Sequence, residues 1–289
     1  MSLKRISHVV EPRFPAAVGR YVDLGRFYDL TAAKLSATEV KAHTYAYKRA
    51  YERAYRYLKA ARLVEEENTA CAAAVFDRRH ALKRLERIGQ RELHTKGKES
   101  GRTVLRFLGS LTHKGYICRF DSVEALCPKA YVLADSWGLA GEGLSLLRTM
   151  ASEKGWDSIS CVCPEDPERL EHLLIPGLGL AFVTSRPGME YPGKPFRRIH
   201  LDALAEPVEK GRQRLQSRLT VLLREEGVAA LKAAKASHDA LEAVYNPYVD
   251  FEGVRAQAAL EAGRAVKKEA ELTAPLPFCL FRTGCPFPS

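Results

Sequence analysis

Hydrophobic positions recur with two different periods along the chain. Between about residues 31 and 93, small and aromatic side chains return every three or four residues, which predicts amphipathic helix. The stretch is too long for one ordinary helix, so it predicts a helical hairpin that turns near Glu65 to Thr69. The recurring positions are Ala46, Ala50, Ala54, Leu58 and Ala61, with Tyr47, Tyr51 and Tyr55 beside them.

Between residues 103 and 203 the pattern changes to short apolar runs separated by helical spacing. Strands are predicted for GYICRFDSV, AYVLAD, SISCVCP and LGLAFVTS. A helix that closes at Gly155 is predicted for LSLLRTMASEKGW, and one helical turn for DPERLEHLL. Strands that alternate with helices predict an α/β fold with βαβ units and a parallel sheet. From Leu204 to Thr273 the helical period returns, interrupted at Pro247.

The two helical regions share a short repeated pattern. LKAAR at residues 58–62 matches LKAAK at residues 231–235, an offset of 231 − 58 = 173. Only the second copy follows βαβ sequence, so we interpret the chain as the remainder of a two-copy parent. The predicted division is an incomplete, mainly helical first repeat (1–95), an α/β core (96–203), and the helical segment and tail of the second repeat (204–289).

The composition is that of a soluble globular protein, with 46% hydrophobic and 28% charged residues. The longest apolar run, Leu173 to Val183, is shorter than the ~18 residues that a membrane helix needs, and proline and glycine break it. The N-terminus has no apolar core of a signal peptide, which predicts a cytoplasmic location without membrane contact.

The net charge of +10 would suit nucleic acid or nucleotide phosphates. The basic residues are, however, scattered through the helices and mixed with acids, as in YKRAYERAYRYLKAARLVEEEN. No sequence signature of a nucleic-acid-binding motif is present, so the pattern favours a solvated helical face and disfavours nucleic acid as partner.

The seven cysteines have no metal-ligand spacing. Cys161 and Cys163 alternate within a strand pattern, and Cys279 and Cys285 lie in the tail without a paired ligand motif. We interpret the cysteines as small buried side chains in a reducing compartment, with a zinc site as the less favoured alternative.

The stretch YVLADSWGLAGEGLSLLRTM (131–150) begins as a strand, breaks into glycines and continues as a helix. Phosphate loops of the form G-x-x-x-x-G-K-[ST] have this order, because their backbone amides and helix N-terminus cradle phosphates while the lysine and hydroxyl bind phosphate and Mg²⁺. The candidate nucleotide-binding residues of this degenerate loop are Ser136, Gly138, Gly141, Glu142, Gly143 and Ser145.

Two of these positions depart from the pattern in their chemistry. Glu142 stands where the lysine belongs, and Gly143 replaces the hydroxyl residue. Reversing one charge at ~4 Å costs several kcal/mol even at an effective dielectric near 20. The sequence therefore predicts weak binding of ATP with Mg²⁺ at most, and it assigns neither a catalytic residue nor a metal ligand. The backbone shape looks preserved, so Glu142→Lys with Gly143→Ser is expected to restore affinity.

Two further residues are accessory candidates near the loop. Thr184 ends a predicted strand, and Asp166 lies at the start of DPERLEHLL. The alternative for Asp166 is an acid that complements a helix N-terminus without binding metal.

The string CPEDPERLEHLLIPGLGLAFVTSRP resembles a segment of a family of uncharacterised tandem P-loop ATPase-like proteins found in clostridia and related bacteria. In that family a Cys-x-x-Asp-Pro-x-x-Leu-(Asp/Glu) motif leads into Ile-Pro-x-Leu and an apolar strand. SHVVEPRFPAAVGRYVDLGRFYD and AYRYLKAARLVEEEN are similar to the segments that follow that strand in the first copy. The resemblance covers about residues 7–263 and implies a P-loop NTPase fold with nucleotide bound at each loop.

Three functions are therefore expected in order of preference. The first is a P-loop NTPase family protein whose degenerate loop binds nucleotide weakly or not at all. The second is a helical interaction module whose basic face binds a protein, another copy of the chain, or nucleic acid. The third is an active ATPase completed by another chain.

Overall fold

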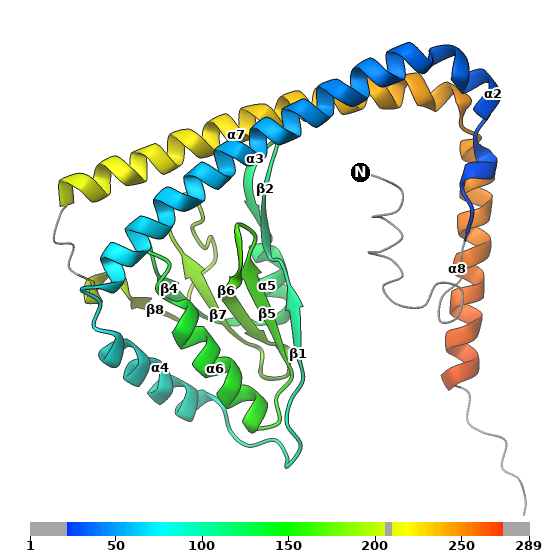
Figure 1. Ribbon diagram of the computed structural model, residues 1–289. Coiled ribbons are helices and arrows are strands. Elements are labelled where there is room, and N and C mark those ends of the chain that lie inside the picture. The colour runs from blue at the N-terminus through cyan, green and yellow to red at the C-terminus, as the bar shows by residue number, and fades with distance from the viewer. Residues whose placement is uncertain (1–21, 206–209, 274–289) are drawn as a thin grey trace, which may run out of the picture. The chain divides into compact units, whose positions relative to one another are not determined.

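The computed structural model describes residues 22–205 and 210–273 (Figure 1). Its contacts divide the chain into one unit of residues 43–240 and a second unit made of residues 1–42 and 241–289. The predictions for residues 8–21 and for Cys279 and Cys285 lie outside the described residues.

A six-stranded sheet forms the centre of the unit of residues 43–240. In spatial order its strands are β1 (Thr103–Arg106), β5 (Ser158–Cys163), β6 (Asp166–Ile175), β7 (Leu180–Ser185), β4 (Lys129–Ala134) and β8 (Arg197–His200). β4 is parallel to β7 and β8, and β1 is parallel to β5, whereas β6 is antiparallel to both of its neighbours. Five strands therefore share one direction, and the predicted α/β class with a mostly parallel sheet is confirmed.

β6 corrects one prediction from the sequence. DPERLEHLL lies in this strand and not in a helical turn. Short connections join β6 to β5 and to β7, and the second of them turns at Gly179, whose φ of 58° lies in the left-handed region that favours glycine. In the pairing with β5, Cys161 lies opposite His172 but Val162 lies opposite Leu170. Glu171 is therefore the extra residue of a β-bulge.

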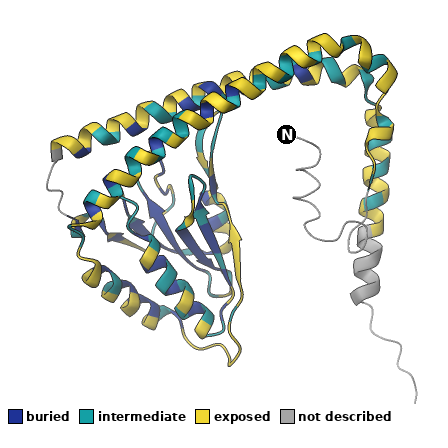
Figure 2. Ribbon diagram, viewed as in Figure 1, coloured by how far each residue is buried: buried dark blue, intermediate teal, exposed yellow. Residues whose placement is uncertain are grey.

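One face of the sheet is covered by two helices, α6 (Gly141–Glu153) and α4 (Arg78–Glu92). They bury Leu144 and Leu85 against Tyr131 and Phe182, whose rings stack at a centroid distance of 5.2 Å. The strands are buried on this side because the alternate residues Tyr131 and Leu133 of β4, and Leu180 and Phe182 of β7, belong to the same apolar core (Figure 2).

The opposite face is covered by the short helix α5 (Phe120–Leu126). Phe120 and Val123 pack there against Val132 and Val183. Cys127 and Cys161 belong to the same cluster, and Cys163 is also buried, as the sequence predicted for thiols of this kind. A two-stranded hairpin precedes α5 and consists of β2 (Gly109–Thr112) and β3 (Gly115–Cys118).

Two long helices, α3 (Ala37–Ala73) and α7 (Lys210–Tyr245), lie side by side in antiparallel directions (Figure 1). We call the paired parts within residues 43–240 the coil. Its buried seam uses small and polar side chains at seven-residue spacing, which lets the helices approach closely. A Cβ atom at Gly227 would come within 2.6 Å of Leu58 Cδ2. The seam residues are Ala54, Ala61 and Asn68 on α3, and Gln213, Thr220, Gly227 and Ala234 on α7.

The coil corrects the predicted helical hairpin. Residues 65–69 lie inside α3, which continues to Ala73, and the turn falls at residues 74–77. Asp77 then begins α4, because its carboxylate accepts the His80 amide at 3.0 Å. The antiparallel partner of α3 is α7, far away in the sequence, and not α4.

The second unit is described by short helices and the helix α8 (Phe251–Thr273). Asp29 begins α2 (Leu30–Ala33) by accepting the amides of Thr31 and Ala32. The predicted interruption at Pro247 is confirmed, because this residue lies in the short helix η5 (Asn246–Tyr248) that precedes α8. The remaining elements are η1 (Gly25–Phe27), η2 (Lys34–Ser36) and, in the larger unit, η3 (Pro176–Leu178) and η4 (Asp202–Leu204).

Within residues 22–95 the described backbone is helical or irregular, apart from single bridges at Tyr28 and Phe76. The division at residues 95/96 and 203/204 into parts of two repeats stays a prediction. No described helix combines the length and the apolar character needed to cross a membrane.

Candidate functional site

The loop of residues 135–140 lies where ligands usually bind to sheets of this kind. It follows the carboxyl end of β4, whose two neighbours, β7 and β8, lie on opposite sides of it. In open α/β sheets, ligands bind in the crevice at the carboxyl ends of strands, where the strand order reverses. The predicted strand, loop and helix are therefore present, with α6 beginning at Gly141.

The amide groups at the end of this loop are bonded to a side chain of the loop itself. Asp135 accepts the amide of Leu139 at 2.7 Å and the amide of Ala140 at 2.8 Å. The Asp135 side chain is buried, and burial raises its pKa above the ordinary value, an effect that Asp202 reinforces while the two amides and Arg169 oppose it. A carboxylate thus occupies the place where a phosphate loop presents amides to its ligand.

The rest of the loop is also bonded within the protein. Ser136 donates both its amide, at 2.7 Å, and its hydroxyl, at 2.9 Å, to the carboxylate of Asp202. Thr69 of α3 donates its hydroxyl to the Trp137 carbonyl at 2.8 Å. Gly138 has a φ of 72°, and a Cβ atom there would overlap Arg169. The coil and β6 therefore contact this glycine turn and cover it.

The lysine of a phosphate loop is missing when the pattern is started at either of the first two residues after β4, and also when it is started at Gly138, where Leu144 takes its position. When the pattern starts at the first residue after β4, Asp135 takes the first glycine position and Gly141 the lysine position. When it starts at Ser136, Glu142 takes the lysine position. Glu142 is half exposed and points to α4, where Arg78 Nε donates to it at 2.5 Å and Arg78 Nη2 makes a second bond. This glutamate is therefore engaged with a neighbouring helix on the outside of the loop.

Gly143 has a packing role that the sequence pattern did not predict. It lies in the first turn of α6, and a Cβ atom there would overlap Leu85 Cδ1 of α4. Leu85 is buried in the core, so a serine at position 143 needs this side chain to move. The expected repair by Glu142→Lys with Gly143→Ser is thus opposed by an ion pair at the first position and by packing at the second.

A partly buried network of ion pairs covers the carboxyl ends of the strands. Arg224 of α7 bonds to Glu65 of α3 at 2.5 Å and to Glu165 at 2.6 Å. Arg186, after β7, bonds to Glu65 at 2.8 Å and to Glu171 at 3.1 Å. Burial acts to raise the pKa of Glu65, but the charges of Arg224 and Arg186 lower it below the ordinary value, so this carboxylate is ionised.

A very small cavity lies beside the loop. Its volume is about 10 Å³, and its lining includes Asp135, Gly138, Gly141, Arg169 and Thr184. A single water needs roughly 10–15 Å³ of such volume. The hydroxyl of Thr184 is buried there without a hydrogen-bond partner in the described structure.

The sequence-predicted site residues are thus only partly brought together. Gly138, Gly141 and Thr184 line the small cavity. Ser136 turns to Asp202, and Ser145 contributes a backbone carbonyl to Thr149 one turn further along α6. Asp166 begins β6, not a helix, and bonds to Arg62 at 3.2 Å, so the predicted role at a helix N-terminus is wrong.

Five residues that shape this region were not predicted from the sequence. Asp135 lies inside the glycine loop itself, and Asp202 lies far along the chain. The other three lie among further charged residues or directly after a predicted strand, positions that carry no specific signal of buried partners. These residues are Arg169, Arg186 and Glu171.

No protein-family model, curated protein or solved structure matches the chain. The resemblance to tandem P-loop ATPase-like proteins therefore stays a prediction that is carried by the quoted motifs.

Proposed function

We propose that this protein carries a degenerate phosphate loop, that it binds nucleotide weakly or not at all, and that it works as a non-enzymatic interaction protein. One observation carries the proposal, namely that the Asp135 carboxylate accepts the hydrogen bonds of Leu139 and Ala140. In a phosphate loop these amides point at the ligand. An incoming phosphate would have to displace a buried carboxylate while being repelled by its charge.

The ion network supports the same function. Glu65 and Arg224 join the coil to the strand ends through Arg186 and Glu165, and the cavity of about 10 Å³ beside the loop is far smaller than a triphosphate. Opening it would leave buried charges without partners, which is strongly destabilising. The same observation disfavours an ATPase completed by another chain, because the loop amides are already bonded within this one.

The outward side of α7 favours a protein partner. Leu215, Leu219 and Leu222 are 67%, 43% and 56% exposed, at spacings of four and three residues. They lie on the side of the helix opposite to the seam, and the exposed Arg214 and Arg218 lie beside them. An apolar stripe with basic neighbours suits a helix or groove whose rim is acidic. Nucleic acid would use the arginines but not the leucines.

Titration calorimetry with ATP and Mg²⁺ tests the nucleotide part of the proposal. We expect no saturable binding by the wild-type protein up to about 1 mM, where the binding free energy would be only about −4 kcal/mol. Magnesium-dependent phosphate release that persists through repurification would contradict the non-enzymatic function.

A matched pair of variants tests the role of Asp135. Asp135→Ala frees the two amides, so it is expected to bind inorganic phosphate or ATP more tightly than the wild type does. Asp121→Ala removes an exposed carboxylate outside the loop and is expected to change nothing. Both variants are first confirmed as folded by circular dichroism. Measurable wild-type binding that Asp135→Ala fails to strengthen would show that the carboxylate does not occupy an anion position.

A further inference from the structure

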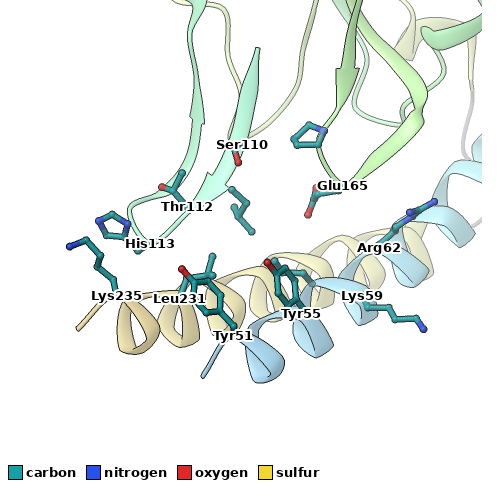
Figure 3. A pocket seen from close by; sticks show the side chains of 13 residues that line it. Tyr51, Tyr55, Lys59, Arg62, Ser110, Thr112, His113, Glu165, Leu231 and Lys235 are labelled. Carbon is teal, nitrogen blue, oxygen red and sulfur yellow. The ribbon is translucent and has the colours of Figure 1, made fainter. Parts of the chain in front are cut away.

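A ligand-sized cavity lies apart from the closed loop, between the coil and the hairpin β2–β3 (Figure 3). Its volume is about 680 Å³, within the range of roughly 300–1,000 Å³ that small-molecule sites have. It shares no lining residue with the small cavity beside Asp135. We propose that this cavity binds a small planar aromatic anion, that is, a ring carrying a carboxylate, sulfonate or phosphate group.

The aromatic wall of the cavity is the reason for proposing an aromatic ring in the ligand. Tyr51 and Tyr55 lie one turn apart on α3, on the side that faces the hairpin (Figure 3). Their rings are nearly parallel, with an interplanar angle of 21° and a centroid distance of 6.2 Å. Tyr55 is 64% exposed, so its ring is accessible for stacking. Leu111 from β2 and Leu231 from α7 provide apolar contacts beside the rings.

The charges around the cavity are the reason for proposing an anionic group on the ligand. Three cationic side chains line it, Lys59, Arg62 and Lys235, against the single carboxylate of Glu165. That carboxylate is bonded to Arg224 at 2.6 Å and 3.1 Å. Arg62 is likewise bonded to Glu66 at 2.6 Å and to Asp166 at 3.2 Å. These two side chains therefore contribute little net charge, and the positive balance comes from Lys59 and Lys235. The balance of the lining is therefore positive, which favours anions.

One end of the cavity is suited to hold that group. His113, at the tip of the hairpin, and Lys235 of α7 lie close together there, whereas Glu165 and Arg62 lie toward the other end (Figure 3). Lys235 also bonds to Asp239, but this pair is exposed and one turn apart on the same helix, so it is weak. Ser110 and Thr112 also line the cavity, and the Thr112 hydroxyl is bonded within the hairpin to the Gly115 carbonyl at 2.9 Å.

Fluorescence titration with two dyes tests the ligand class. Anilinonaphthalene sulfonate has planar rings and a negative charge, and N-phenylnaphthylamine has the same rings without the charge. We expect the wild-type protein to bind the sulfonate at least about tenfold more tightly than the neutral dye. Equal affinities for both dyes, or no binding of the sulfonate, would overturn the proposal.

Variants then locate the binding. Tyr55→Ala is expected to weaken sulfonate binding at least about fivefold, in line with the contribution of aromatic stacking to ligand affinity. Tyr55→Phe, which keeps the ring, and Tyr45→Ala, an equally exposed tyrosine of α3 outside the cavity, are expected to bind like the wild type. Lys235→Gln is expected to reduce the preference for the charged dye, and the exposed Lys232→Gln to leave it unchanged. Equal effects of Tyr55→Ala and Tyr45→Ala would refute binding at this cavity.

Displacement of the bound sulfonate separates two sources of the ligand. Displacement by adenosine monophosphate would indicate a nucleotide, and displacement by salicylate alone would indicate an aromatic acid. If neither compound displaces the dye, the proposal fails. Asp135→Ala is included as a further protein, because its loop lies outside the cavity. An unchanged dye affinity in that variant keeps this result independent of the nucleotide part of the proposed function.

Discussion

We expect the stability of the fold to depend on pH because of His172, which lies in the middle of β6. The side chain is completely buried, and its Nδ1 atom accepts the amide of Thr184 at 3.1 Å. The ring packs edge-on against Phe120 at a centroid distance of 5.7 Å. Burial, reinforced by the charge of Arg186, lowers the pKa of His172 to about 3. The folded protein therefore holds this imidazole neutral at neutral pH and well below the ordinary pKa of histidine.

The sign and size of the effect follow from proton linkage. An unfolded histidine has a pKa near 6.5, so the unfolded chain takes up a proton below that pH while the folded chain does not. The stabilisation is fully present above about pH 6.5 and is lost progressively as the pH falls toward about 3. Between pH 7 and pH 5 a single such group reduces the free energy of unfolding by about 2 kcal/mol. Asp135 has a raised pKa in the folded protein. Its protonation therefore stabilises the fold as the pH falls, opposite to the effect of His172.

Urea denaturation at pH 7 and pH 5 measures this loss. His172→Asn keeps an acceptor near the Thr184 amide but cannot take up a proton, so the variant is expected to lose about 2 kcal/mol less than the wild type between the two pH values. The exposed His80→Asn serves as the control and should keep the wild-type difference. Because each protein is compared with itself, a general destabilisation of His172→Asn does not affect the result. A pH difference in His172→Asn equal to that of the wild type would refute the assignment of a neutral buried imidazole.

Two further predictions concern the contacts that close the loop region. Gly143→Ser is expected to lower the free energy of unfolding by about 1–3 kcal/mol because a Cβ atom overlaps Leu85, whereas Gly263→Ser, which has open space, should change it little; equal urea midpoints for the two variants would refute this packing argument. Arg224→Met leaves Glu65 and Glu165 without a shared partner and is expected to cost about 3–5 kcal/mol, against less than about 0.5 kcal/mol for the exposed Arg214→Met. Similar melting temperatures for these two variants would mean that the network contributes little.

The segments AYVLAD, SISCVCP and LGLAFVTS form β4, β5 and β7 as predicted, whereas in GYICRFDSV only GYIC is a strand and FDSV lies in α5. β1, β2 and β8 were not predicted, and β6 was mistaken for a helical turn. Leu170 and Leu173 pack into the same cluster although they are three residues apart. In a regular strand such residues point to opposite faces, whereas in a helix they share one. The bulge at Glu171 shifts the alternation by one residue, so the strand carries the spacing of a helical turn. Such a bulge depends on pairing with β5 and has no signal within the segment itself.

The position of the loop was likewise predictable, but the groups that close it were not. A strand, glycines and a helix follow one another in the sequence, and local spacing is enough to find them. Arg169, Arg186 and Arg224 come from three elements that meet only in the folded unit. Their partners on α3 and beside β6 could be identified only after the antiparallel pairing of α3 with α7 was known.

The same ion pairs cover the loop and fix the position of the coil on the sheet. The same carboxylate, Glu65 on α3, bonds to Arg186 at the strand ends and to Arg224 on α7, so it joins the sheet to both helices of the coil. A nucleotide at the strand ends would have to remove the coil from the position that these ion pairs give it. Under our proposal, loss of nucleotide binding and a fixed position of the coil on the sheet are therefore two consequences of one set of contacts. The fixed coil in turn forms one wall of the 680 Å³ cavity, because Tyr51 and Tyr55 face the hairpin only while α3 is held in place.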